Sequence, residues 1–133
     1  MTIDTFTECF KALSDKTRLR IFFLLSSLNK ELAVCEIMNS LHESSYNVSR
    51  HLKILKYAGL IKEHKQSRWV MCSLNLENEK LLFELARLAR LLDKTLFADD
   101  IKRAHEQLKL RKHGKIVFHS SKPGAGTGRK RKL

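Results

Sequence analysis

The sequence predicts a mainly α-helical fold with one small β-hairpin, and three observations lead to this prediction. Apolar residues recur at helical spacing through most of residues 3–57. Two short β-rich runs around Gln66 and Ser67 interrupt that spacing. A leucine-rich helical pattern then resumes after Asn75. A chain of 133 residues is long enough for one domain with a real core, so we expect these elements to share it.

Two helices are expected in the N-terminal part of the chain. Ile3, Phe6 and Phe10 follow helical spacing in a first, short segment. Asp15 then supplies the signal for an N-cap, and residues 17–28 are apolar almost all round. A helix of that kind is typically buried at the centre of a small domain.

Residues 33–41 and 44–60 predict two further helices, joined by a short polar link. In the second of them, Val48, Leu52 and Leu55 form one apolar stripe. The opposite face carries only hydroxyls and cations: Ser45, Ser49, Arg50, Lys53 and Lys56. Such a pair of helices is typical of a helix-turn-helix, whose second helix enters the major groove of DNA. An ordinary amphipathic surface helix would show the same pattern, so only the neighbouring elements can distinguish the two interpretations.

The segment after the second helix predicts a β-hairpin with a polar, basic tip. The two β-rich runs span residues 61–65 and 69–74. The residues at or near the tip are Lys62, His64, Lys65, Gln66, Ser67 and Arg68. A hairpin directly after a recognition helix is a wing, and its tip can lie along the phosphates or reach the adjacent minor groove. The predicted fold is therefore a winged helix-turn-helix domain.

A leucine face follows the hairpin, and the predicted domain has no core left for it to cover. Its residues are Leu81, Leu85, Leu88 and Leu92. We expect this face to form a dimer seam, so that the domain dimerises through its N- and C-terminal helices, although packing on the first helix would use part of it. Residues 1–98 thus predict a winged helix-turn-helix and dimerisation domain.

Two further segments are predicted after this domain. Residues 99–119 are expected to form a C-terminal helical extension that is capped by Asp99 and Asp100. Residues 120–133 are rich in Ser, Gly and Lys/Arg and predict a disordered basic tail, whose charge favours nonspecific contact with phosphates. From Asp99 onward the chain has 11 Lys/Arg and 3 Asp/Glu, so the C-terminal part dominates the charge.

The net charge of +12 and the pI near 9.9 point to a polyanionic partner, with nucleic acid ahead of an anionic membrane surface. The polar N-terminus lacks the apolar segment of a secretion signal. The longest apolar run, residues 21–25, is too short to span a bilayer. We therefore expect a cytoplasmic protein without a membrane partner, whose odd number of cysteines favours free thiols. No nucleophile–base pair, phosphate loop or metal cluster is apparent in the sequence, which argues against an enzyme.

Four motifs occur in order along the chain. They are Leu-Ser-Asp-Lys-Thr-Arg-Leu-Arg-Ile (residues 13–21), Glu-Leu-Ala-Val-Cys-Glu-Ile (31–37), Val-Ser-Arg-His-Leu-Lys-Ile-Leu-Lys-Tyr-Ala-Gly-Leu-Ile (48–61) and Arg-Trp-Val (68–70). Over about residues 5–96 the chain resembles the ArsR (arsenical-resistance repressor) family. The resemblance implies a homodimeric repressor that leaves a palindromic operator when an effector binds. It also implies DNA contacts by residues of the recognition helix and the wing: Ser44, Tyr46, Asn47, Ser49, Arg50, His51 and Arg68.

The resemblance bears on the effector as well. Arsenical sensors of this family typically carry Cys-Val-Cys in the third helix, whereas here the triplet is Ala-Val-Cys, ending at Cys35. Trivalent arsenic requires three converging thiolates. Cys9, Cys35 and Cys72 would form such a site only if folding or dimerisation brings them together. The family's zinc-binding pattern of histidines on the last helix is absent, because residues 76–96 contain no His.

Cys35 is the predicted sensor, because it keeps the family position at the start of a helix, whose dipole favours a thiolate. Arsenite, another thiophilic metal ion or an oxidant would then be the effector. The alternative is that all three cysteines are structural and behave as small buried hydrophobes, so that the regulator has no metal site.

Two hypotheses of different class remain open. The first is a sequence-specific, dimeric transcriptional repressor that contacts DNA through the residues named above and through Ser45, Lys53, Lys65 and Gln66. The second is a nonspecific DNA-coating or architectural protein that uses the same wing and the basic tail. A salt titration with an operator and a scrambled duplex separates them, because only a repressor shows a specificity ratio of at least roughly a thousandfold.

Overall fold

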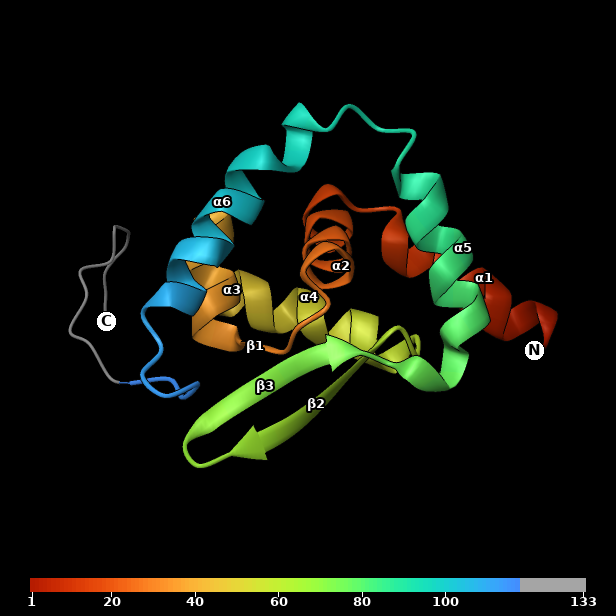
Figure 1. The fold of residues 1–133 in the computed structure, drawn as a ribbon. Coiled ribbons are helices and arrows are strands. Elements are labelled where there is room, and N and C mark those ends of the chain that lie inside the picture. Colours follow the sequence, from red (N-terminus) through yellow and green to blue (C-terminus); the bar gives the residue numbers. More distant parts are fainter. Residues whose placement is uncertain (118–133) are drawn as a thin grey trace.

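Helix α2 (Lys16–Leu28) lies at the centre of the computed structural model, which describes residues 1–117 (Figure 1). The Asp15 side chain caps its first turn by accepting a hydrogen bond from the Arg18 N–H at 3.0 Å. Asn29 ends the helix in a left-handed conformation with φ 51°. Four of its apolar side chains are buried: Ile21, Phe22, Leu24 and Leu25. The predicted central helix is therefore confirmed.

Helix α1 (Ile3–Leu13) precedes α2 and begins with a capping box formed by Thr2 and Thr5. The predicted helix is confirmed, but its apolar stripe is not in the core. Cys9 and Ala12 are the buried residues of α1. Three large apolar residues are exposed instead: Ile3, Phe6 and Phe10. In a single copy of the chain this stripe faces solvent.

Helices α3 (Val34–Leu41) and α4 (Ser45–Tyr57) form the predicted helix-turn-helix. His42 ends α3 in a left-handed conformation with φ 56°. Ser44 begins α4, because its hydroxyl accepts a hydrogen bond from the Asn47 N–H at 3.1 Å. The apolar stripe of α4 is buried as predicted: Val48, Leu52 and Leu55.

The sheet has three strands rather than the two of the predicted hairpin. Strands β2 (Ile61–Gln66) and β3 (Trp69–Leu74) pair antiparallel, and Ser67 turns the chain between them with φ 60°. The third strand, β1 (Leu32–Ala33), pairs with residues 71–72 on the other edge of β3. Sequence reasoning placed the second residue of this strand at the start of a helix, because a two-residue strand has no periodicity to detect.

The short helix η1 (Leu76–Asn78) and helix α5 (Glu79–Ala89) follow the sheet, and α6 (Thr95–Lys109) comes after them. Helices α5 and α6 lie on opposite sides of α2 (Figure 1). Helix α5 ends at Ala89, so Leu92, the last residue of the predicted leucine face, lies beyond it. The two predicted capping aspartates, Asp99 and Asp100, lie inside α6 and do not cap it.

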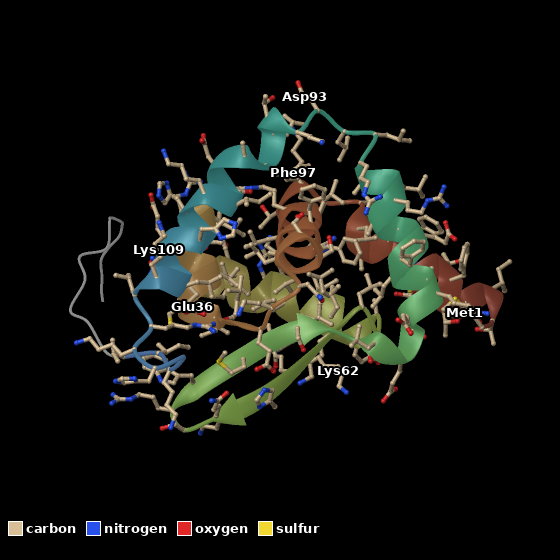
Figure 2. All side chains as sticks on the ribbon, in the orientation of Figure 1. Met1, Glu36, Lys62, Asp93, Phe97 and Lys109 are labelled. Atoms are coloured by element: carbon tan, nitrogen blue, oxygen red, sulfur yellow. The ribbon has the colours of Figure 1, made fainter. Side chains whose placement is uncertain are left out.

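Helix α6 is an integral part of the domain. It packs against α3 and α2 and buries Phe97 and Ala104 (Figure 2). The Phe97 ring stacks on Phe23 of α2, with the ring centroids 4.2 Å apart. The predicted boundary between residues 98 and 99 therefore falls within a helix of the common core, and the predicted extension is not separate. The predicted basic tail, residues 120–133, lies outside the described residues.

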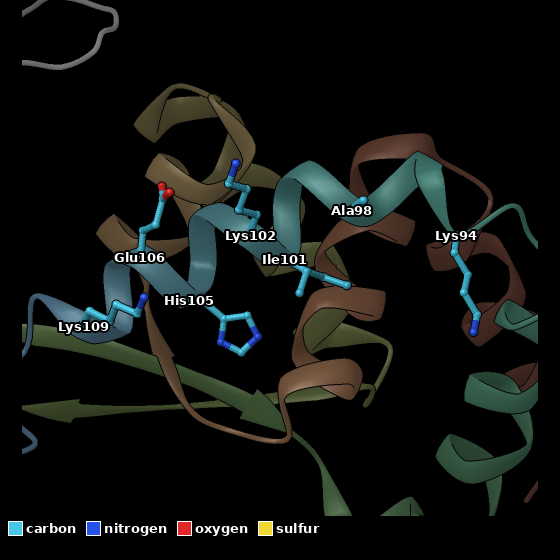
Figure 3. Close-up of a pocket in the computed structure, with 7 residues that line it drawn as sticks. All are labelled: Lys94, Ala98, Ile101, Lys102, His105, Glu106 and Lys109. Atoms are coloured by element: carbon cyan, nitrogen blue, oxygen red, sulfur yellow. The ribbon is translucent and has the colours of Figure 1, made fainter.

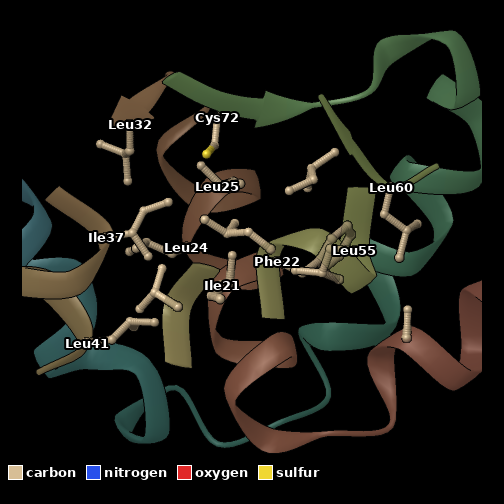
Figure 4. Close-up of a cluster of buried hydrophobic side chains, with 14 of the residues drawn as sticks. Ile21, Phe22, Leu24, Leu25, Leu32, Ile37, Leu41, Leu55, Leu60 and Cys72 are labelled. Atoms are coloured by element: carbon tan, nitrogen blue, oxygen red, sulfur yellow. The ribbon is translucent and has the colours of Figure 1, made fainter. Parts of the chain in front are cut away.

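The core surrounds α2 (Figure 4). The buried side chains of α2 share the core with apolar residues from α3, α4, the sheet and the turn before β2: Leu32, Ile37, Leu41, Leu55, Leu60 and Cys72. Burial of apolar surface stabilises such a core by about 25 cal/mol per Å². Because this burial fixes α4 on one side, the opposite side of α4 is directed outward. Among the described helices, none is long and apolar enough to cross a membrane.

Candidate nucleic-acid interface

The outward face of α4 carries most of the residues predicted to contact DNA. Ser44 at the N-cap is exposed, and so are five residues of the helix: Ser45, Tyr46, Ser49, Arg50 and Lys53. The buried apolar stripe determines this orientation, because an amphipathic helix can direct only one face to the core. The exposed set offers hydroxyls, a guanidinium and an ammonium group. These groups donate hydrogen bonds to base edges and phosphates.

Arg50 lies beside Tyr46, one helical turn away. Its guanidinium carbon is 5.9 Å from the centre of the Tyr46 ring, a cation–π contact. An arginine fork can donate two hydrogen bonds to a guanine in the major groove. The contact with the ring limits the rotamers of an otherwise exposed side chain. Among the exposed cations of α4, Arg50 is therefore the first candidate for a base contact.

His51 is on the core side of α4, which contradicts its predicted contact with DNA. The residue is 7% exposed. Arg18 Nη1 donates to its Nδ1 at 3.1 Å, and Asp15 Oδ2 is 3.8 Å away. Burial lowers the pKa of the imidazole, and the attraction of Asp15 opposes this shift. The sequence contained the signal, because His51 follows Val48 by three residues and precedes Leu55 by four, which places it on the apolar stripe.

Two other residues of the helix-turn-helix depart from expectation. Asn47 is half-buried, and its amide Nδ2 donates to Glu43 Oε1 at 3.3 Å. Tyr57, which sequence reasoning missed, is 92% exposed. It lies two helical turns after Arg50, so it belongs to the same outward face. That spacing was the available signal.

The wing tip is exposed as predicted. Lys65, Gln66 and Arg68 all lie at the surface. The Arg68 guanidinium carbon is 5.5 Å from the centre of the Trp69 ring, and Trp69 is half-buried. The tryptophan ring thus packs against the basic tip and supports it.

Ion pairs join the wing to the rest of the domain. Lys56 Nζ of α4 lies 3.3 Å from Glu63 Oε1 of β2. The imidazole Nε2 of His64 contacts the Glu31 carboxylate in the segment before β1. These pairs tie β2 to α4 and to the segment before β1, although each is at least partly exposed and contributes little to stability. Because Lys56 is paired with Glu63, it adds less net positive charge to the outward face of α4 than the sequence suggested.

The three cysteines do not form a metal site in one copy of the chain. Cys9 and Cys72 are buried, and Cys35 is half-buried. Among residues 1–117, no group of three His, Cys, Asp or Glu side chains could hold a metal ion. The described residues of a single copy therefore do not fit the three-thiolate site that trivalent arsenic requires.

The expected thiolate at Cys35 is also contradicted. Burial raises the pKa of the Cys35 thiol to about 11, and the negative charge of Glu36 adds to this shift. Hydrogen bonds from backbone N–H groups and the charge of Arg111 oppose it but do not outweigh it. Burial likewise raises the pKa of Cys72, to about 12. The helix start does favour a thiolate, but desolvation of the sulfur is the larger effect here.

The leucines of the expected dimer seam divide between core and surface. Leu85 is buried, and Leu81 packs partly against the core, whereas Leu88 and Leu92 are exposed. Large apolar residues are exposed on α1, on α5 and just after the end of α5. We call them the apolar surface: Ile3, Phe6, Phe10, Phe83, Leu88, Leu91 and Leu92. Both helices lie on the side of α2 away from α6 (Figure 1). Large exposed apolar patches typically mark interaction surfaces, so these residues are candidates for one.

A shallow depression runs along α6 (Figure 3). Its lining consists of Lys94, Ala98, Ile101, Lys102, His105, Glu106 and Lys109. All of these residues belong to α6 or to its N-cap. Because one helix supplies the whole lining, the depression does not enclose a ligand, and it is separate from the face of α4.

Comparison with known proteins places this architecture in a regulatory family. The family model described as "Bacterial regulatory protein, arsR family" matches residues 15–63, from the cap of α2 into β2. The chain is 37% identical over 93 residues to the arsenic resistance transcriptional regulator ArsR2 of Pseudomonas putida, an alignment that covers 70% of this chain and 80% of that protein. It is 46% identical over 63 residues to the arsenical resistance operon repressor of Escherichia coli, which covers 47% of this chain and 53% of the repressor.

Solved structures show the same fold. HlyU from Vibrio cholerae superposes with a TM-score of 0.56 at 30% sequence identity, covering 66% of this chain and 97% of that one. The homodimeric winged helix-turn-helix DNA-binding domain of Mb0332 from Mycobacterium bovis superposes with a TM-score of 0.58 at 26% identity, covering 66% and 80%. The predicted winged helix-turn-helix fold is therefore confirmed.

Proposed function

The chain belongs to the ArsR family of bacterial regulatory proteins, and from this membership we propose that it is a sequence-specific, DNA-binding transcriptional repressor. One observation carries the proposal beyond the family. The exposed face of α4 combines hydroxyls, an arginine ordered against Tyr46 and a lysine. These are the groups that read base edges and neutralise phosphates, and they lie on the helix that follows the turn of the motif.

The repressor acts as a homodimer in this proposal. The apolar surface on α1 and α5 is exposed in one copy and requires a partner to cover it. A similar structure, Mb0332, is described as homodimeric. A two-fold dimer presents two copies of α4, so its operator should consist of two inverted half-sites. Exposed Lys65, Gln66 and Arg68 would contact the flanking backbone from each wing.

Replacing Arg50 with alanine should weaken operator binding and leave the fold intact. Loss of a base or phosphate contact is expected to cost about 1–3 kcal/mol, or about 5- to 150-fold in affinity. The operator is the best duplex selected by the wild-type protein from a randomised pool, and fluorescence anisotropy measures the affinity. Lys102→Ala removes one positive charge from an exposed position of α6, outside both α4 and the apolar surface, and serves as the control.

Two results of this experiment would count against the proposal. If folded Arg50→Ala and Lys102→Ala bind the operator equally well, α4 does not read DNA. If the wild-type protein binds the selected and scrambled duplexes with similar affinity at each salt concentration, the chain is the nonspecific architectural protein of the rival hypothesis. A repressor should prefer its operator by at least roughly a thousandfold.

For the effector, we propose that Cys35 is the thiol on which a thiol-reactive compound acts. Two observations support it: Cys35 is half-buried while Cys9 and Cys72 are buried, and it lies in the first turn of α3, the helix before the turn of the motif. Modification there would alter the packing of α3 and, through it, of α4. Because the pKa of this thiol is raised to about 11, only a small thiolate fraction exists at neutral pH.

The rate of Cys35 modification should therefore rise with pH. Iodoacetamide should label Cys35 before Cys9 and Cys72, and the rate should increase about tenfold per pH unit below the pKa of the thiol. Peroxide, which reacts with a single thiol, should release wild-type protein and Cys9→Ser from the operator and leave Cys35→Ser bound. If Cys35→Ser is released as readily as the wild type, the thiol is structural and the effector acts elsewhere.

A further inference from the structure

Asp100, in the second turn of α6, is a buried carboxylate that holds two arginines from different helices. The residue is 3% exposed. Its Oδ2 accepts from Arg20 Nε of α2 at 2.9 Å, and its Oδ1 accepts from Arg20 Nη2 at 2.8 Å. Arg103 Nη2, one turn further along α6, donates to the same Oδ1 at 3.1 Å. A single carboxylate thus fixes two guanidinium groups side by side.

Both arginines also donate to the end of α3. Arg20 Nη2 donates to the Leu41 carbonyl at 3.0 Å, and Arg103 Nε donates to the Ser40 carbonyl at 2.7 Å. The last carbonyls of a helix have no partner within the helix, so these bonds satisfy groups that would otherwise be buried without one. The chain turns from α3 into α4 directly after these residues. The two arginines therefore hold the backbone directly before the turn of the helix-turn-helix.

A second set of contacts continues from Arg20 into the recognition helix. Arg20 Nη1 lies 3.8 Å from Glu43 Oε2, within the turn. Glu43 Oε1 in turn accepts from Asn47 Nδ2 of α4 at 3.3 Å. Asp100 of α6 is thus connected to the first turns of α4 through Arg20 and Glu43, all within the described structure. Local sequence spacing links none of these helices, because Arg20 and Asp100 are 80 positions apart.

The charges explain why Asp100 in particular matters. Arg20 and Arg103 carry two positive charges in a partly buried space, and Asp100 is the carboxylate that both of them contact. Its hydrogen bonds are the main reason that the pKa of Arg20 is raised. Without the carboxylate the guanidinium groups would repel each other, and neither would be held in line with the carbonyls of α3. The end of α3 would then lose its partners as well.

We propose that Asp100 is a positioning residue for DNA recognition, which fixes Arg20 and Arg103 against the end of α3 and thereby sets the orientation of α4. This role rests on the proposed function, because it concerns the same recognition helix. It assigns to α6 a part in operator binding although α6 itself does not belong to the DNA-contacting face. A purely structural role would stabilise the domain without distinguishing one DNA sequence from another.

The test compares Asp100→Asn with Asp99→Asn in the full-length protein. Asp99 is the exposed neighbour on the same helix, so both variants lose one negative charge and gain the same long-range attraction to DNA. The probes are the duplex selected by the wild-type protein and a scrambled duplex. Asp100→Asn should bind the selected duplex at least about tenfold more weakly than Asp99→Asn. The two variants should bind the scrambled duplex equally, with equal salt slopes.

A spectroscopic measurement separates positioning from general destabilisation. In Asp100→Asn the backbone amide NMR signals of residues 40–47 should shift, while those of α5 should stay in place. If Asp100→Asn does not fold, Arg103→Lys replaces it, because lysine keeps the charge but lacks the fork that contacts both Ser40 and Asp100. A smaller loss of operator affinity, about threefold to tenfold, is then expected.

Each outcome of these experiments either supports or contradicts the positioning role of Asp100. If the variant that folds binds the selected duplex as well as Asp99→Asn does, Asp100 does not position α4. If it weakens binding to the selected and scrambled duplexes alike, its role is only structural, and the inference is wrong. If the wild-type protein shows no preference for the selected duplex, the proposed function itself fails. That last result is visible without any variant, so the two failures are distinguishable.

Discussion

Replacing Leu88 with glutamate should give a folded monomer that has lost at least about a hundredfold in operator affinity. Leu88 is 56% exposed in one copy of the chain, so a glutamate there would be solvated in the monomer. At the interface of the proposed dimer the same carboxylate would be desolvated without a partner. A monomer also presents a single α4 to a two-part operator, which removes the gain from binding both half-sites together.

Analytical ultracentrifugation measures the assembly, and circular dichroism checks the fold. Leu110→Glu is the matched control, because Leu110 is 48% exposed at the C-terminal end of α6, away from the apolar surface. That variant should remain dimeric. Leu85→Glu should instead fail to fold, since Leu85 is 6% exposed and packs in the core. An intact dimer of Leu88→Glu would show that the apolar surface is not the seam.

Replacing Arg111 with methionine should lower the free energy of unfolding by about 3–5 kcal/mol. Arg111 Nε and Nη2 donate to the two carboxylate oxygens of Glu36 at 2.9 and 2.6 Å. The Glu36 side chain is 4% exposed, and Glu36 also accepts from the Ala33 N–H at 2.9 Å. Methionine retains the apolar length of arginine but leaves Glu36 as a buried charge without its cation.

Urea denaturation followed by circular dichroism measures the effect. Lys112→Met is the control, because Lys112 is the exposed neighbour in the same turn. The double variant Glu36→Gln/Arg111→Met removes both charges and should recover part of the lost stability, since the cost comes from the unpaired carboxylate. If Arg111→Met is no less stable than Lys112→Met, residues beyond α6 do not help to hold the domain together.

The sequence by itself determined the elements whose signals are local. The cap at Asp15 and the buried stripe of Val48, Leu52 and Leu55 located α2 and α4, because helix periodicity and capping depend on residues only a few positions apart. The β-rich runs around Ser67 located the wing in the same way. Since the buried stripe also decides which side of α4 is outward, most residues of its exposed face could be predicted before the fold was known.

Only the tertiary structure decided which apolar and charged groups face a partner. Phe6 and Phe10 have the same helical spacing as core residues but are exposed, and Leu85 is buried while Leu88 on the same helix is not. Spacing shows that a helix has an apolar side, but the neighbouring elements determine what covers it. The two-residue strand β1 could not be predicted for a related reason. It exists because β3 pairs with it, not because its two residues prefer a strand.

The largest difference concerns α6. The sequence predicted that Asp99 and Asp100 cap a separate helical extension over residues 99–119. In the structure Asp100 of α6 pairs with Arg20, and Arg111, just after α6, pairs with Glu36, 75 positions earlier in the chain. An ion pair of this kind leaves no periodic pattern, because its two halves come together only when distant helices pack. Packing also surrounds Cys35, so that desolvation outweighs the helix dipole and the thiol stays protonated. The sequence could name these charged and ionisable residues, but folding alone determined their partners.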